Sequence, residues 1–147
     1  MLKITRMSDY AVVVLVELMQ TKSCMSVSGL AQEMKLTEPT ISKVLKALVQ
    51  AGIVISRRGS NGGYSLAASP QDISVEQIIN AIDGPIAITD CANGNEPDCV
   101  LSDVCSIRGR WDGVNTAIRG VLSNVTLADM AGGMHNKEKE QRHYGSY

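Results

Sequence analysis

Residues 37–52 read TEPTISKVLKALVQAG, and this stretch has the pattern of one amphipathic helix. Apolar residues recur in it at the spacing i, i+3, i+4 and i+7, which is typical of a helix face turned toward a core. They are Ile41, Val44, Leu45 and Leu48. Thr37 suits the N-cap, Pro39 lies in the first turn, where its missing N–H costs nothing, and Gly52 suits a left-handed helix end. We therefore expect a helix with one buried and one polar face.

Two shorter helical patterns precede this stretch. Residues 7–20 carry an apolar stripe with Ser8 and Asp9 as cap candidates, and residues 26–35 form a second pattern capped by one of its serines. Two helices joined by a tight turn, the second with a polar outer face, are typical of a helix-turn-helix. In that motif the N-terminal end of the second helix reads base edges in the DNA major groove. An ordinary three-helix core with a solvated face fits the same pattern.

A basic, glycine-rich segment follows directly. Residues 53–57 and 63–67 read as two short strands, and the Asn-Gly pair between them is a strong hairpin-turn signal. A hairpin in this place is typical of the wing of a winged helix, where Arg57 and Arg58 would contact phosphate or the minor groove. A plain edge hairpin explains the turn but not the placement of both arginines. The predicted DNA-facing residues are Thr37, Glu38, Pro39, Thr40, Lys43, Lys46, Arg57, Arg58 and Asn61.

The charge is unevenly distributed along the chain. Residues 1–69 carry eight Lys or Arg and four Asp or Glu, whereas residues 70–147 carry six and eleven, and the net charge is −1. A basic first half favours an anionic partner such as double-stranded DNA, although a scatter of solvated charges gives the same totals. The apolar run at residues 11–16 is cut by Glu17, so we expect no membrane span, no export signal and a cytoplasmic protein.

Three of the four cysteines lie in residues 91–105, which read CANGNEPDCVLSDVC. Because a chain that is not exported keeps its thiols reduced, such thiols are more often metal ligands or redox groups than disulfide partners. Three thiolates suit a soft metal centre, either zinc or an iron–sulfur cluster. Both usually take four protein ligands, so the fourth ligand is open. We expect no enzyme, because the sequence shows no C-x-x-C and no His/Asp arrangement that would activate these thiols.

Helical patterns flank the cysteines on both sides. The first begins with a capping box at Ser74 and Gln77 and is stopped by Gly84-Pro85. The second is a longer helix whose apolar stripe consists of Trp111, Val114, Ile118, Val121, Leu122 and Val125. Its opposite face carries Asp112, Asn115 and Arg119.

The apolar stripe of the longer helix has little core of its own to pack against. Pairing with a second copy across a two-fold axis would bury it and would place two reading helices roughly 34–36 Å apart, one DNA turn. Folding back onto the same domain is the alternative. Residues 126–130 read as a short terminal turn of helix, and the polar tail that follows as disordered.

Together these motifs resemble those of the Rrf-type winged-helix regulators, a family that includes iron–sulfur cluster assembly repressors and the nitric-oxide-sensing repressor. The likeness covers about residues 1–130. Its anchors, in order, are SDYA at 8–11, TEPTISKVLKAL at 37–48, RRGSNGGYSLA at 57–67, DGPIAITDC at 83–91, and three cysteines before a Trp-led helix. Within the family, the chain is most similar to the regulators of the SUF cluster-assembly operon.

The resemblance implies a homodimeric repressor whose operator affinity depends on an iron–sulfur cluster, of the 2Fe–2S or 4Fe–4S type. Cys91, Cys99 and Cys105 match the family's cluster cysteines. Asp9 matches, by its place in SDYA, an aspartate that completes the site from the partner subunit in the nitric-oxide branch. Two features depart from the family pattern. The spacing from Cys91 to Cys99 is longer than is common, and Arg108 stands where one branch has a histidine ligand, which leaves Asp9, a water or a small thiol as the fourth ligand.

The expected fold is mainly helical with a small β-hairpin: a winged helix-turn-helix followed by a long C-terminal dimerisation helix. The expected parts are a DNA-binding domain at residues 1–84, a cluster-binding loop at 85–108, the dimerisation helix at 109–131 and a disordered tail at 132–147. The expected function is a repressor of SUF cluster-assembly genes that senses cluster supply. The alternatives are a nitric-oxide- or redox-responsive repressor of the same family, or a DNA-binding regulator with zinc or a thiol switch at the cysteines.

Overall fold

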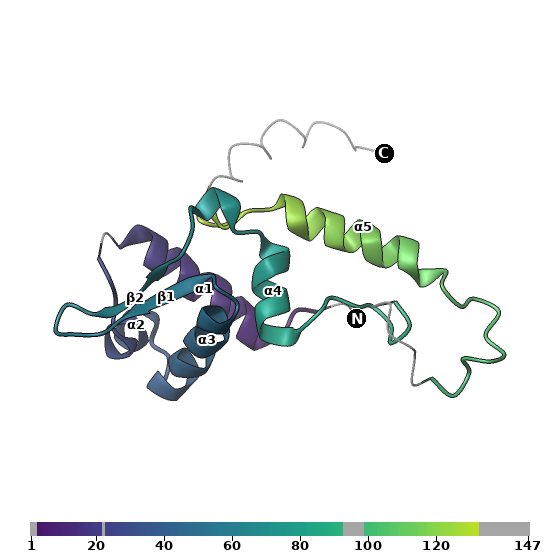
Figure 1. The fold of residues 1–147 in the computed structure, drawn as a ribbon, viewed down its shortest axis with the longest axis horizontal. Coiled ribbons are helices and arrows are strands. Elements are labelled where there is room, and N and C mark those ends of the chain that lie inside the picture. Colours follow the sequence, from purple (N-terminus) through teal and green to yellow (C-terminus); the bar gives the residue numbers. More distant parts are fainter. Residues whose placement is uncertain (1–2, 22, 93–98, 133–147) are drawn as a thin grey trace, which may run out of the picture.

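Figure 1 shows the computed structural model of the chain, which describes residues 3–21, 23–92 and 99–132. The elements in order are α1 (Arg6–Gln20), α2 (Val27–Met34), α3 (Glu38–Gln50), β1 (Val54–Arg57), β2 (Gly63–Leu66), the 3-10 helix η1 (Pro70–Asp72), α4 (Val75–Asp83), α5 (Trp111–Asn124) and α6 (Leu127–Met130). The predicted mainly helical fold with a β-hairpin is confirmed. Within the described ranges, no helix has the length and apolar character needed to cross a bilayer. The predicted tail from residue 133 onward and residues 93–98 of the predicted cluster loop lie outside the described residues.

Helices α1, α2 and α3 pack around one aliphatic core. The four residues predicted to face inward from α3 are all fully buried, as are Leu15 of α1 and Leu30 of α2. Ser26 caps α2 by accepting a hydrogen bond from the Gly29 N–H at 3.1 Å. Lys35 ends that helix with a φ of 54°, a left-handed conformation that turns the chain sharply into α3. The helix-turn-helix predicted from the sequence is therefore present.

The start of α1 differs from the prediction. The N-cap is Thr5, whose hydroxyl oxygen accepts a hydrogen bond from the Ser8 N–H at 3.1 Å, so Ser8 and Asp9 lie inside the first turn and the cap role predicted for them is wrong. Ser8 is fully buried and its hydroxyl donates to the Asp83 carboxylate at 2.7 Å. Thr, Ser and Asp are all good caps. Here Ser8 is not the cap because its hydroxyl bonds to Asp83 instead. Asp83 lies 75 residues away, so the local sequence does not reveal this.

Strands β1 and β2 form the predicted hairpin. They pair antiparallel, with Val54 opposite Leu66 at one end and Arg57 opposite Gly63 at the other. The tight turn lies one residue earlier than the Asn-Gly pair suggested, because the Gly62 N–H donates to the Gly59 carbonyl at 3.0 Å.

Strand β2 is fixed, near the loop end of the hairpin, to the connection between α1 and α2. Tyr64 exchanges two backbone hydrogen bonds with Met25, at 2.8 and 3.0 Å. Gly63 has a φ of 142°, and a Cβ placed there would lie 2.5 Å from the Met25 carbonyl oxygen. Position 63 therefore requires glycine both for its backbone conformation and for this close approach.

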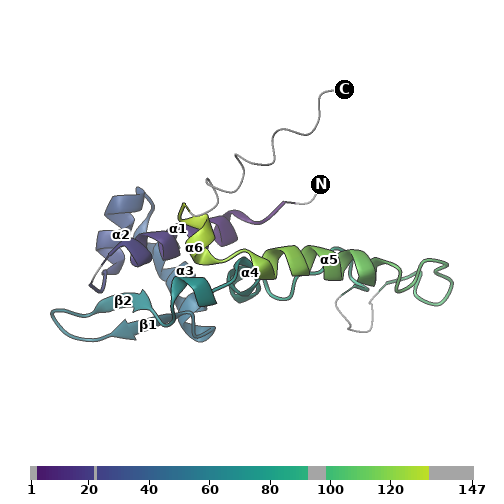
Figure 2. The ribbon, with the colours of Figure 1, turned by 90° about the horizontal axis from the view of Figure 1, so that it is seen from above.

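Helix α4 has both predicted ends. The Ser74 hydroxyl accepts from the Gln77 N–H at 3.2 Å while the Gln77 side chain accepts from the Ser74 N–H at 2.8 Å, and Gly84, at a φ of 84°, ends the helix. Helix α5 begins far from the winged domain and runs back toward it (Figures 1 and 2). The short α6, the predicted terminal turn of helix, is capped by Thr126 and docks on α1 through the fully buried Leu127.

Candidate DNA-binding surface and cysteine site

The outer side of α3 presents the residues predicted to read DNA. Thr37, Glu38 and Pro39 at its start are exposed, as are Lys43 and Lys46 further along, because the opposite face is buried in the core. Thr40 is half-buried, and its hydroxyl oxygen lies 2.8 Å from that of Thr37. The N-terminal turns of α3 thus offer short polar side chains and lysines to solvent, which suits hydrogen bonding to base edges and phosphates.

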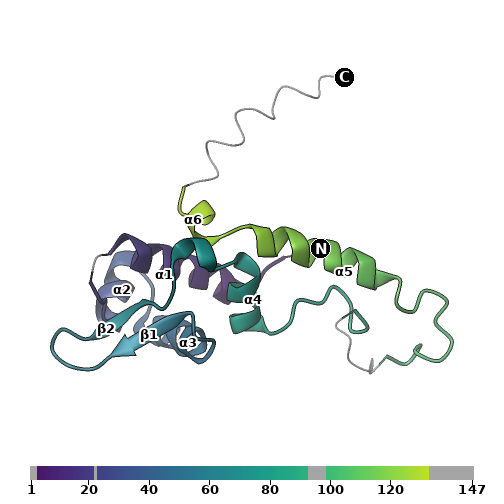
Figure 3. The same cartoon turned by 45° about the horizontal axis from the view of Figure 1, so that its top comes forward.

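The β-hairpin extends this surface. It lies beside α3 in Figure 3, and β1 contacts that helix. Arg57 at the end of β1, Arg58 in the loop and Asn61 in the turn are all exposed. Together with the two lysines of α3, the predicted DNA-facing residues carry four positive charges and one negative charge, that of Glu38. A surface that combines a polar helix start with exposed arginines on a neighbouring hairpin can bind the phosphates of a duplex while the helix enters a groove.

The cysteines occupy the connection between α4 and α5. Cys91 and Cys105 are half-buried, Cys99 is exposed, and all four cysteines of the chain are free thiols. Among the described residues, no three Cys, His, Asp or Glu side chains come close enough together to hold a metal ion. Three free thiols are the donor type that zinc and iron–sulfur centres take, so the residues fit such a group by chemistry. Their assembly into one site stays a prediction.

Cys91 lies in a turn with defined hydrogen bonds. The Ala92 N–H donates to the Thr89 carbonyl at 3.0 Å, and the Thr89 hydroxyl oxygen lies 3.3 Å from the Cys91 sulfur. Ala92 is buried beneath this turn. The side chain of Asn115, on α5, contacts the same segment and is only 3% exposed.

Asn115 does not lie on the face of α5 that the sequence predicts for it. It was assigned to the outer, polar face of α5, yet its amide accepts from the Ile88 N–H at 3.1 Å and donates to the carbonyls of Ile86 and Ala92 at 3.2 and 3.0 Å. The sequence did contain a signal. Trp111, Asn115, Ile118 and Leu122 follow helical spacing, so Asn115 shares a face with apolar residues.

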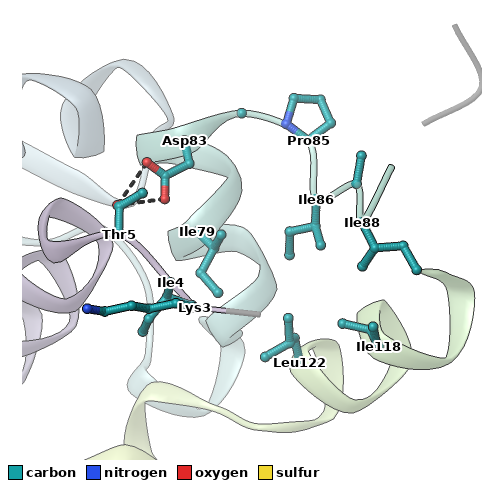
Figure 4. A pocket seen from close by; sticks show the side chains of 12 residues that line it. Lys3, Ile4, Thr5, Ile79, Asp83, Pro85, Ile86, Ile88, Ile118 and Leu122 are labelled. Carbon is teal, nitrogen blue, oxygen red and sulfur yellow. Dashed lines mark hydrogen bonds between the residues drawn. The ribbon is translucent and has the colours of Figure 1, made fainter. Parts of the chain in front are cut away.

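A second polar contact joins α1 to the end of α4, just before the segment that carries Cys91. The Asp83 carboxylate accepts from the Thr5 hydroxyl at 2.8 and 2.9 Å (Figure 4). It also accepts from the buried Ser8 hydroxyl. Asp9, the predicted partner-subunit ligand, is the next residue and is exposed in the first turn of α1. Two hydroxyl groups near the start of α1 therefore hold the end of α4, where the cysteine connection begins, by charge-assisted hydrogen bonds.

An apolar groove of about 590 Å³ lies beside this contact. Figure 4 shows it between the chain that enters α1, helix α4, the segment after Pro85 and helix α5. Ile118 and Leu122 of the predicted stripe face it from α5, opposite Ile4 and Ile79. Part of the α5 stripe thus packs toward its own domain, as the fold-back alternative proposed.

The rest of the α5 stripe faces solvent. Trp111 and Val114 are exposed, and Val121 is 65% exposed, whereas Val125 is half-buried. Arg119, on the polar side, pairs with Glu76 of α4 at 2.7 Å and holds α5 to the domain. The segment before α5 adds further exposed apolar side chains, which are Val100, Leu101, Val104 and Ile107.

A helix-turn-helix followed directly by a basic β-hairpin defines a winged-helix DNA-binding protein. The model of the Rrf2 family, described as an iron-dependent transcriptional regulator, matches residues 4–133 of the chain. The chain belongs to the Rrf2 family of transcriptional regulators. It is therefore a DNA-binding regulator and not an enzyme, and the resemblance to the Rrf-type family stated from the sequence motifs is confirmed.

Relatives of known name lie within this family. The transcriptional regulator NsrR of Bacillus licheniformis is 28% identical over 131 residues, which cover 88% of this chain and 92% of NsrR. The solved structure of CymR, the global cysteine regulator of B. subtilis, has a TM-score of 0.69 at 30% identity and covers 89% of this chain and 97% of CymR. The structure of T. potens IscR has a TM-score of 0.65 at 30% identity, with 98% and 94% covered.

Proposed function

We propose that this Rrf2 regulator is a cytoplasmic repressor that senses iron–sulfur cluster supply and controls cluster-assembly genes of the SUF type. The observation that carries the proposal is the position of three free thiols, Cys91, Cys99 and Cys105, in the connection between the reading domain and α5. A metal centre bound by these thiols can alter the positions of both the DNA-reading domain and α5. The family description as iron-dependent supports iron rather than another metal.

In this proposal the three thiolates hold a 2Fe–2S or 4Fe–4S cluster, which supplies a change of charge and coordination when it is gained, lost or oxidised. Asp9 of the partner subunit is the fourth ligand. Its exposure in the first turn of α1 leaves it free to meet a second chain, and its neighbour Ser8 is fixed to Asp83. Closing the site requires Cys99 and Cys105 to approach Cys91.

The active form in this proposal is a homodimer built on α5. The exposed apolar stripe at Trp111, Val114 and Val121 and the exposed apolar side chains of residues 100–107 give a second copy a surface to cover. An isologous contact between two such surfaces places the two α3 helices on one face of the duplex. DNA reading would then use the exposed start of α3 in the major groove, with Arg57 and Arg58 of the hairpin on phosphate or in the minor groove.

Anaerobic purification with visible absorption and with iron, sulfide and zinc analysis tests the metal proposal. We expect a brown protein with iron and sulfide, and loss of colour in Cys99→Ala. Cys24→Ala is the matched control, because Cys24 lies between α1 and α2, away from the other three, and should keep its colour. A colourless wild-type protein with one zinc per chain would refute the cluster and leave the DNA-binding fold intact.

A thiol-switch DNA-binding regulator is the second candidate. The exposed thiol of Cys99 favours it, because exposed thiols are open to oxidants. In that case operator binding would titrate with oxidant in a metal-free protein. A nitric-oxide- or redox-responsive repressor of the same family is the other alternative, and its operator binding would respond to nitric oxide or oxidant only in the metal-loaded protein. Zinc at the three cysteines would give the same fold with a colourless site.

A further inference from the structure

We infer that Asn115 is the positioning residue of the cysteine site: it holds the segment at residues 86–92 on α5 and so presents Cys91 as the preformed ligand of the metal centre. The inference rests on the proposed function, since it concerns the same three thiols. It assigns a role to a residue that is not itself a ligand and that lies on a different element from Cys91.

The contact is complete in hydrogen-bonding terms. The Asn115 side-chain oxygen accepts from the Ile88 N–H, and its nitrogen donates to two carbonyls, those of Ile86 and Ala92. The partners lie 23 to 29 residues away in the sequence. At 3% exposure the side chain is withdrawn from water, so losing it would leave the buried Ala92 carbonyl and two half-buried backbone groups without this partner. An unpaired polar group that stays buried destabilises the folded chain. The three hydrogen bonds of Asn115, here called the clamp, are therefore favoured over any arrangement that breaks them.

The clamp acts on both sides of Cys91. Ile88 precedes it and Ala92 follows it directly, and the turn from Thr89 to Ala92 encloses it. On the upstream side, Asn80 of α4 adds a bond by accepting from the Ile86 N–H at 3.1 Å. The backbone that carries Cys91 is therefore restrained by two helices at once.

The other two thiols are held differently. In the described chain, the carbonyls of Cys99 and Cys105 accept backbone hydrogen bonds from residues three positions further on, Ser102 and Arg108, at 2.9 and 3.4 Å. Their neighbours are exposed, Val100 at 99%. We therefore infer that Cys91 is the fixed ligand and that Cys99 and Cys105 are recruited to it.

The chemistry at position 115 requires a carboxamide. An amide supplies an acceptor and two donor hydrogens on one planar group, which matches one N–H and two carbonyls. Leucine has a similar size but neither donor nor acceptor. Aspartate keeps the acceptor for Ile88 but turns a carboxylate oxygen toward carbonyl oxygens. Residues that orient a metal ligand typically contribute 10–100-fold to metal affinity.

The test compares Asn115→Leu with Arg119→Met in the full chain. Both substitutions remove a polar contact that holds α5, but the Arg119–Glu76 pair ties α5 to α4 and not to the Cys91 segment. In the metal-free protein, the rate at which iodoacetamide alkylates each thiol is followed by mass spectrometry. In a second arm, ferrous iron and sulfide are titrated anaerobically into each protein, with bound iron and visible circular dichroism as readouts. Circular dichroism and thermal unfolding establish that both variants fold.

We expect Asn115→Leu to raise the alkylation rate of Cys91 alone and to weaken iron uptake about 10-fold, with Asn115→Asp intermediate and Arg119→Met close to wild type. Equal effects in Asn115→Leu and Arg119→Met would show that Asn115 only docks α5, and would overturn the inference. If the wild-type protein takes up iron and Asn115→Leu takes it up equally well, the inference would also be overturned, while the proposed function would stand. A wild-type protein that takes up no iron and sulfide would refute the proposed function, and the inference with it.

Discussion

At the scale of single residues, the polar side chains that organise the cysteine connection have partners far away in the sequence. Asp83 joins the end of α4 to the start of α1, and Asn115 joins α5 to the segment around Cys91. Ser8 is the most enclosed member of the first contact, since it is fully buried. Removing the acceptor of a buried hydroxyl costs more than the bond itself is worth, because the hydroxyl stays buried and unpaired.

Asp83→Ala should therefore lower the free energy of unfolding of the metal-free protein by about 1.5–3 kcal/mol, the range for a hydrogen bond to a charged group. Urea unfolding followed by circular dichroism at one protein concentration measures it. Asp72→Ala is the matched control, because Asp72 is an exposed carboxylate on η1, and it should change stability by less than about 0.5 kcal/mol. The same loss in both variants would mean that the contact with Ser8 contributes nothing.

At the scale of elements, the reading helix and the wing divide the work of DNA binding. The start of α3 presents side chains that can discriminate bases, whereas the wing presents Arg57 and Arg58, which suit phosphate. Phosphate contacts release counterions and so set how steeply affinity falls with salt, and they affect all sequences alike.

Arg57→Ala and Arg58→Ala should each reduce the slope of log affinity against log salt by about 1, with equal weakening on operator and random duplexes. Fluorescence anisotropy at several salt concentrations checks this. Arg110→Ala removes an exposed cation at the N-cap of α5, away from the wing, and should leave the slope unchanged. A wing variant that loses affinity for the operator alone would instead place that arginine on bases.

Elements set by local signals were predictable from the sequence, and contacts between elements were not. The spacing of Ile41, Val44, Leu45 and Leu48 predicted the buried face of α3, and the Ser74 and Gln77 pair predicted the start of α4. The cap at Thr5 was missed because the hydrogen bond of Thr5 to Asp83 spans 78 residues and has no local signature. The burial of Asn115 had a signal in its helical spacing with apolar residues, but its hydrogen-bond partners, 23 to 29 residues away, had none. For the candidate site, the sequence predicted which thiols to consider but not that one of them lies in a clamped turn.

At the scale of the whole molecule, α5 has two different sides. One side is committed to its own chain through Asn115 and the Arg119–Glu76 pair, while another leaves apolar side chains in solvent. A helix that is anchored on one side and apolar on an exposed side is suited to pairing with a second copy.

Val121→Glu should convert the proposed dimer to monomer at concentrations where the wild-type protein is dimeric, since Val121 is 65% exposed in one chain and a carboxylate there would be buried on pairing. Ser123→Glu, an exposed position near Arg119 on the polar side, is the matched control and should remain dimeric. Sedimentation velocity distinguishes the two states. A dimeric Val121→Glu protein would place the interface elsewhere.

The most direct test of the central claim is operator affinity measured for cluster-loaded and metal-free protein at one salt concentration. A ligand shifts an equilibrium only by its differential affinity for the two states, so a sensor must show a difference between them. We predict tighter binding by the loaded protein, by about 5–150-fold, the usual range for coupled sites. Equal affinities would contradict the account: the chain would remain an Rrf2 regulator that binds DNA, but the three cysteines would not report cluster supply to it.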